Sequence, residues 1–160
     1  MAEKSLFTFD HLTAVAADLN QASDDLTQIV GTLDSALQRL NIGIVAWVQV
    51  IKTNYEDRPQ YYEREELGYA KVDGTWGLAV RKLAGFEGSP EDDEVRDIWL
   101  FNDAPRGLRL RAVEKLPEVI DLLTRSAMKT AERLKKKVAD TRGFAASMGL
   151  WQLDGEKGKK

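Results

Sequence analysis

The stretch HLTAVAADLNQASDDLTQIVGTLDSALQRLN, residues 11–41, decides the fold. Leucine recurs at every seventh position, and an apolar or alanine residue follows each of the first four leucines three positions later. On a helix this spacing gives one continuous apolar stripe. The stripe is wider than a two-column coiled-coil seam, because the position four residues after each of these leucines is also apolar or small. The leucines are Leu12, Leu19, Leu26, Leu33 and Leu40.

The ends of this helix carry recognisable signals. Thr8 or Asp10 can accept hydrogen bonds from the free amides of the first turn. Asn41 and Gly43 tolerate the left-handed conformation that closes a helix. A helix with so wide a stripe needs apolar neighbours on more than one side, and the rest of the chain must supply them.

Three segments read as strands. Ile44–Ile51 is β-branched and apolar on both faces, which is typical of an interior strand. Leu67–Leu83 contains two alternating runs joined at Asp73-Gly74, a dipeptide favoured in tight hairpin turns. Val95–Phe101 supplies the fourth strand. Alternation assigns the inner positions of the hairpin to Ala70, Val72, Leu78 and Val80.

Two segments read as loops. Thr53–Glu66 is polar, contains Pro59 and three tyrosines, and fits no period; it is expected to be either a mobile connection or a binding loop with tyrosine anchors. Ala84–Glu94 is the second, and its run of four acids, Glu91–Glu94, resembles neither a calcium loop nor a magnesium site. We expect these carboxylates to be solvated, since consecutive side chains point in different directions.

After Pro105 the apolar positions step by three and four residues. They predict a short helix, Pro105–Leu116, and a long one from Pro117 to about Met148, either separate or joined through a kink at the proline. The long helix would extend roughly 48 Å, so part of it should overhang the sheet. The fold expected is α+β: a long N-terminal helix, a four-stranded antiparallel sheet and a long C-terminal helix, in one domain (1–149) followed by a tail (150–160).

Composition narrows the chemistry. The chain has 160 residues, the size of one domain, and contains no cysteine and one histidine, His11. Disulfides, thiol nucleophiles and zinc–thiolate sites are therefore excluded, and we expect no metal or cofactor. No window approaches ~18 apolar residues, and the start of the chain lacks the pattern of a secretory signal. The expected location is cytoplasmic, without membrane association.

Charge is divided unevenly along the chain. Residues 1–103 carry 9 basic and 19 acidic side chains, whereas residues 104–160 carry 14 basic and 7 acidic ones, within a net charge of −3. Such asymmetry favours either attraction between the two ends of the fold or a basic surface with its own partner.

The preferred functional hypothesis is a non-catalytic partner-binding or assembly module, of adaptor, chaperone-like or regulatory type. It would form a homodimer through coiled-coil-like helices, because the helices offer more apolar surface than one sheet can cover. Another protein partner would fit the same surface. The opposing view is that the two long helices pair inside a monomer. The expected interface residues are Leu26, Leu33, Leu40, Leu123, Leu134 and Val138.

Two alternatives remain open. A row of basic residues at helical spacing could bind a nucleic-acid backbone through its phosphates, namely Arg125, Lys129, Arg133 and Lys136. A small enzyme with a carboxylate-based site is the second alternative, although no nucleophile–base pair or phosphate-binding glycine loop is recognisable, and no catalytic residue is assigned. A pocket with convergent carboxylates of perturbed pKa would support the enzyme hypothesis.

Overall fold

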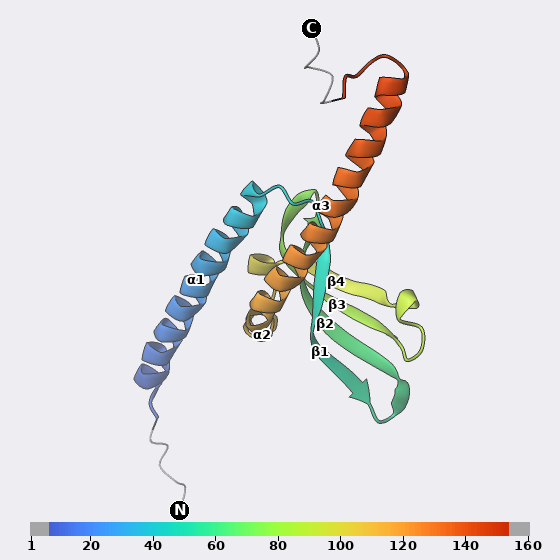
Figure 1. Cartoon of the computed structure of the whole chain (residues 1–160). Helices are drawn as coiled ribbons and strands as arrows, with labels where there is room; N and C mark the ends of the chain where they lie inside the picture. Colours follow the sequence, from blue (N-terminus) through green and yellow to red (C-terminus); the bar gives the residue numbers. More distant parts are fainter. Residues whose placement is uncertain (1–6, 154–160) are drawn as a thin grey trace, which may run out of the picture.

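The computed structural model describes residues 7–153, and it confirms the predicted α+β fold with both long helices (Figure 1). The helices are α1 (Phe9–Arg39), α2 (Arg106–Ala112) and α3 (Leu116–Ser147). The strands are β1 (Ala46–Tyr55), β2 (Arg58–Val72), β3 (Thr75–Phe86) and β4 (Glu94–Leu100). Three short 3-10 turns connect them, η1 (Pro90–Asp92), η2 (Phe101–Asp103) and η3 (Val113–Lys115).

The four strands form one antiparallel sheet in the order β1-β2-β3-β4. The turn between β2 and β3 falls at Asp73-Gly74, as predicted, and both residues have positive φ, 47° and 85°. Positive φ at Asn41 and Gly43 likewise follows the end of α1. At the other end of α1 the Thr8 hydroxyl accepts a hydrogen bond from the His11 amide, which makes Thr8 the N-cap.

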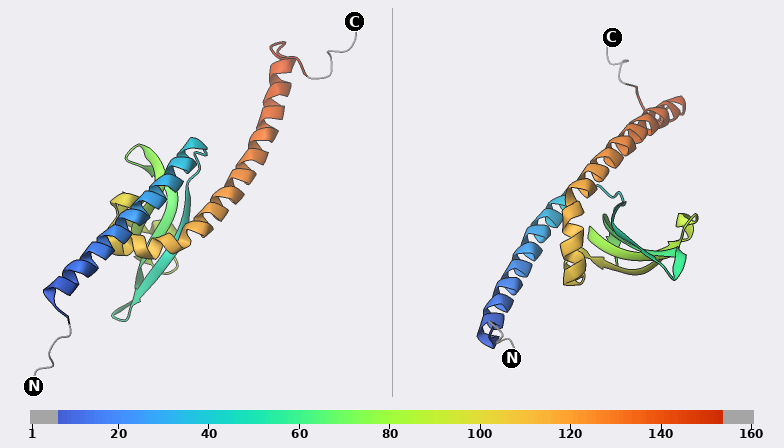
Figure 2. Two further views of the ribbon diagram at one scale, coloured as in Figure 1. Left: turned by 90° about the vertical axis from the view of Figure 1, so that its left-hand side faces the viewer. Right: turned by 90° about the horizontal axis from the view of Figure 1, so that it is seen from below.

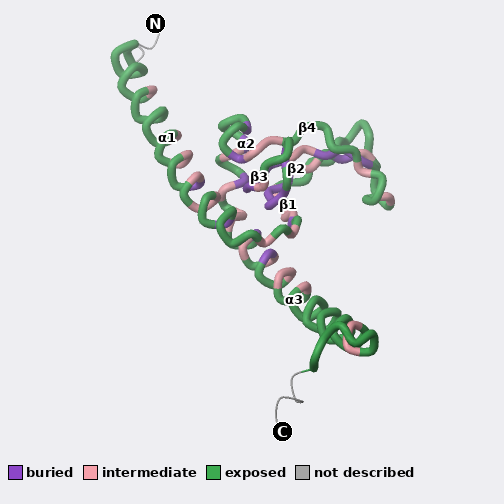
Figure 3. The backbone as a smooth tube through the Cα atoms, turned by 90° about the horizontal axis from the view of Figure 1, so that it is seen from above, coloured by how far each residue is buried: buried purple, intermediate pink, exposed green. Residues whose placement is uncertain are grey.

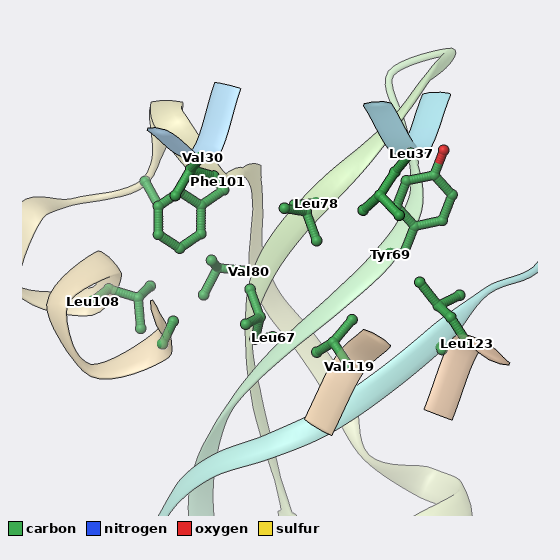
Figure 4. Close-up of a cluster of buried hydrophobic side chains, with 13 residues drawn as sticks. Val30, Leu37, Leu67, Tyr69, Leu78, Val80, Phe101, Leu108, Val119 and Leu123 are labelled. Atoms are coloured by element: carbon green, nitrogen blue, oxygen red, sulfur yellow. The ribbon is translucent and has the colours of Figure 1, made fainter. Parts of the chain in front are cut away.

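The main core lies between the sheet and the helices (Figure 4). Strands β2 and β3 provide its centre, and each of the three helices adds two side chains to it. Burial of these side chains is the main stabilising contribution to the fold. Its largest members are Val30, Leu37, Leu67, Tyr69, Leu78, Val80, Phe101, Leu108, Val119 and Leu123.

The hairpin face predicted from alternation was half wrong. The two-residue turn pairs Val72 with Thr75, so the register pairs Tyr69 with Leu78. Side chains alternate along a strand, so Ala70 and Val72 lie on the opposite face of the hairpin from Tyr69, although both are buried. The register set by the turn, and not the apolar pattern alone, selects the core face.

The predicted loop Thr53–Glu66 is also wrong. Strand β1 continues to Tyr55, a two-residue turn follows, and β2 begins at Arg58. The second predicted loop, Ala84–Glu94, is shorter than expected because β3 extends to Phe86. Backbone pairing with the neighbouring strands holds these polar segments in the sheet. They show no alternation of apolar and polar residues, so the sequence pattern did not predict strands there.

The helices lie on one side of the curved sheet (Figure 2). Helix α1 contacts β3 and η2, α3 contacts β1 and β2, and η3 separates α2 from α3 just before Pro117. The proline therefore lies in the first turn of α3, where its missing amide costs nothing. The amino-terminal part of α1 and the carboxyl-terminal part of α3 project beyond the sheet in opposite directions and are mostly exposed (Figures 2 and 3).

Candidate interaction surface

The projecting part of α1, here called the α1 arm (residues 9–22), is exposed at every position except Ala16. Its apolar stripe nevertheless continues through the arm: Leu12, Val15 and Leu19 are 60%, 49% and 48% exposed. The same spacing reaches the buried Val30 further along the helix. One stripe thus serves the core at one end and meets solvent at the other.

Contacts from α2 mark where the arm leaves the domain. The Arg109 guanidinium donates to Thr27 Oγ1 at 2.9 Å and to Ser23 Oγ at 3.5 Å. Arg106 donates to Asn20 Oδ1 at 3.1 Å. These hydrogen bonds tie α2 to α1 at the inner end of the arm and just beyond it.

The projecting part of α3, here called the α3 arm (residues 131–148), is exposed except at Ala145 and Ala146. Its large apolar side chains lie mostly in solvent. A cavity of about 320 Å³ lies at the end of this arm, between the helix and the returning Trp151. The exposed apolar residues of the arm are Leu134, Val138, Phe144 and Met148.

The structure divides the six predicted interface residues into three groups. Leu123 lies in the core of the chain and is 2% exposed. Leu26 and Leu33 are half-buried against the same core. The exposed group consists of Leu40, Leu134 and Val138. Only this last group is free to make most of its contacts with another chain.

The net charges of helices α1 and α3 are of opposite sign. Asp10, Asp18, Asp24 and Asp25 are all exposed on α1. Asp34 is different, because its carboxylate accepts a hydrogen bond from the Leu78 amide at 2.8 Å and burial raises the pKa of this carboxyl group. The predicted nucleic-acid residues are exposed on α3, and Arg125 pairs with Asp121 at 2.9 Å. The other members of that group are Lys129, Arg133 and Lys136.

A buried ionic network lies away from the arms, and sequence reasoning missed it. Arg64 pairs with Asp93 at 2.8 Å and with Glu66 at 3.0 Å, and Glu66 also pairs with Arg81 at 2.6 Å. Tyr62 donates to Asp93 at 2.5 Å, and this hydrogen bond, together with burial, raises the pKa of Tyr62 to about 12.

Asp93 belongs to the acidic run that was expected to be solvated, and its side chain is 2% exposed. The interpretation of the run was therefore wrong at this residue. Gly85, which has no side chain, leaves the room that the carboxylate occupies. A glycine opposite an acidic loop was the only signal in the sequence for this contact.

A second group of carboxylates lines a cavity of about 260 Å³ on the sheet, with Lys82 and Arg96 nearby. Tyr55 and Tyr61 donate to Glu63 at 2.8 and 3.0 Å, and these hydrogen bonds lower the pKa of Glu63. Glu65 forms a two-bond pair with Arg111. The two tyrosine hydrogen bonds favour the ionised form of Glu63, whereas a general acid needs a carboxyl group of raised pKa.

Within residues 7–153 there is no group of three or more histidine, aspartate or glutamate side chains placed to hold a metal ion. Among the same residues, no helix combines the length and apolar character needed to cross a bilayer. Comparison of the chain with protein-family models, with curated proteins and with solved structures finds no match.

Proposed function

We propose that this protein is a non-catalytic assembly module that forms a homodimer through its two arms. The α1 arm of each copy pairs in antiparallel orientation with the α3 arm of the other copy. The observation that carries this proposal is the continuation of both core stripes onto exposed helix, where the exposed fractions range from 45% to 60% for Leu12, Leu19, Leu134 and Val138. Exposed apolar stripes of this length are typical of surfaces that another chain covers.

The directions of the arms support this arrangement. The α1 arm reaches outward from the sheet toward the amino terminus, and the α3 arm reaches in the opposite direction toward the carboxyl end (Figure 2). A two-fold rotation between the arms places each α1 arm beside the partner's α3 arm with opposite chain direction. The contact is then self-complementary and closes after two copies. Antiparallel pairing also brings opposite ends of the helix dipoles together.

Charge supports the same pairing. At ~100° per residue, Asp18 and Asp25 lie along one margin of the α1 stripe. Arg133 and Lys137 lie along the equivalent margin of the α3 stripe. Equivalent margins face each other across an antiparallel helix pair. Acidic side chains of one copy would thus meet basic side chains of the other, at two symmetric seams.

The test exchanges these charges. One variant carries Asp18→Lys and Asp25→Lys, and the other carries Arg133→Glu and Lys137→Glu; all four positions are exposed on helix surfaces. Each variant alone places like charges at both seams and should lower the association constant by about one to three orders of magnitude. Mixing the two variants restores opposite charges at both seams, so a mixed dimer should form.

Analytical ultracentrifugation of each variant and of the equimolar mixture measures these states. Circular dichroism confirms that the variants keep their helices. A wild-type chain that sediments as a monomer at micromolar concentration contradicts the proposal. Dimers of undiminished affinity in both single variants contradict the assignment of the arms as the seam.

Binding to a nucleic-acid backbone stays as a second candidate. The observation in its favour is that Arg125, Lys129, Arg133 and Lys136 form an exposed basic row on α3. Phosphate contacts of this kind depend strongly on salt, because binding releases counterions. The two candidates differ in their partner, so gel-shift and sedimentation experiments separate them.

A further inference from the structure

The carboxyl end of α3 carries a preformed apolar pocket. Trp151 folds back along the helix, and the Arg142 guanidinium lies 5.7 Å from the centre of its ring. The cavity between Trp151 and the last turns of α3 has a volume of about 320 Å³. Its remaining lining residues are Leu134, Lys137, Val138, Thr141 and Ala145.

The turn that returns Trp151 to the helix is specified by the backbone. Gly149 has φ of +72°, the Leu150 amide donates to the Ala145 carbonyl at 2.9 Å, and the Gly149 amide donates to the Ala146 carbonyl at 3.0 Å. This pair of hydrogen bonds is the Schellman motif, which ends a helix in a fixed geometry. The position of Trp151 thus follows from a defined turn, and the pocket is present before any partner binds.

We infer that this pocket receives Phe9 of a second copy, an inference that rests on the proposed pairing of α1 with the partner's α3. Phe9 is the first residue of α1 and is 80% exposed. A phenyl ring with so much exposed surface at the end of an apolar stripe matches the size and chemistry of the cavity. Aromatic side chains that fill a pocket on the partner are the usual energetic anchors of interfaces.

Phe9 and Ala145 lie nearly equally far beyond the outermost buried residue of their own helix. Phe9 lies 21 residues before the buried Val30, and Ala145 lies 22 residues after the buried Leu123. At ~1.5 Å per residue these spans are about 32 and 33 Å. Arms that overlap over their full length therefore bring Phe9 beside the turn of α3 that contains Ala145.

The rotational setting agrees with the axial one. At ~100° per residue, Phe9 lies on the margin of the α1 stripe opposite to Asp18. On α3, Arg142 of the pocket lies on the margin opposite to Arg133. When the acidic and basic margins meet on one side of the helix pair, Phe9 faces the pocket on the other side.

Because the chain contains no cysteine, disulfide trapping tests this contact directly. A chain with Phe9→Cys and a chain of different mass with Ala145→Cys are mixed at a concentration above the dissociation constant of the proposed dimer. The mixture is then treated with oxidised glutathione. A mixed cross-linked dimer is expected on a non-reducing gel, since a disulfide requires the two Cβ atoms to approach within ~4.5 Å. The matched control pairs Ala145→Cys with Ile29→Cys, an exposed α1 position 20 residues away, and should give none.

A second measurement does not depend on cysteine chemistry. Phe9→Ala should weaken the dimer about tenfold or more, whereas Phe9→Leu, which still fills the pocket, should weaken it less. A dimer in sedimentation that shows neither the cross-link nor sensitivity to Phe9→Ala overturns the pocket assignment and leaves the proposed function standing. A monomeric wild-type chain overturns both.

Discussion

Helix α3 contains one leucine in the core and one in the arm, and truncating them should affect stability differently. Leu123 is 2% exposed and Leu134 is 59% exposed. They are 11 residues apart, which is about three turns, so both lie on nearly the same face of one helix. The substitution Leu→Ala at each position removes the same atoms from the same helix face, and only the surroundings differ.

Leu123→Ala should cost about 3 kcal/mol, because it removes buried methyl groups and leaves a cavity beside Val119 and Tyr69. For a chain of this size, 1 kcal/mol corresponds to roughly 3 °C in Tm, so the Tm should fall by about 10 °C. Leu134→Ala should change the unfolding free energy of the isolated chain by less than about 0.5 kcal/mol, since the side chain is mostly solvated and alanine is a strong helix former.

The assay is thermal and urea unfolding followed by circular dichroism, at protein concentrations below and above the dimer dissociation constant. In dilute protein only Leu123→Ala should lower the midpoint. In concentrated protein the midpoint of Leu134→Ala should also fall below that of wild type, because the variant would lose the stabilisation that the proposed dimer adds. Equal losses for the two variants in dilute protein would refute the division of α3 into a core part and an arm.

Three further predictions follow from the network and from the basic row. Gly85→Ala should destabilise the chain by about 3 kcal/mol, measured by urea unfolding, because the new methyl group collides with the Asp93 carboxylate and breaks a buried pair. The pKa of Tyr62 is raised from 10.0 to about 12 in the folded chain, so its contribution to stability is complete below pH 10 and is lost as the pH rises toward 12; Tyr62→Phe should flatten this part of the stability–pH curve. If nucleic acid is the partner, the wild-type chain should shift labelled DNA or RNA in a gel at low salt, and substitution of four basic residues by glutamate should abolish the shift. Absence of a wild-type shift at low salt contradicts this candidate function. The four positions are Arg125, Lys129, Arg133 and Lys136.

The elements that could be predicted from the sequence are those with a strong local signal. The 3.6-residue period of α1 and α3, the Asp73-Gly74 turn and the Thr8 cap each depend on neighbouring residues alone. The polar halves of β1 and β2 have no such signal. Thr53 pairs with Glu63 and Lys52 with Arg64 across the strands, and these partners are identifiable only once the register is known.

The buried network was hidden for a related reason. Asp93 lies in a run of four acids, and a local reading assigns all four to solvent. Its partners Tyr62 and Arg64 come from β2, about 30 residues earlier, and the space that it occupies comes from Gly85 on β3. A carboxylate is buried only where a cation and a hydroxyl converge on it, and such convergence is a property of the sheet.

The boundary between core and arm could not be predicted from the sequence, for a similar reason. The spacing of Leu12, Leu19 and Leu26 does not change where α1 leaves the domain, and Leu123 and Leu134 occupy equivalent positions of one stripe. What ends the core is the width of the four-stranded sheet, which is shorter than either helix. A chain that needed only to cover this sheet would gain nothing from apolar side chains beyond its edge, and polar residues there would lower the risk of aggregation. The persistence of the stripe past the edge favours a second surface that buries it, and the opposite directions and opposite charges of the two arms support the proposal that this surface belongs to another copy of the chain.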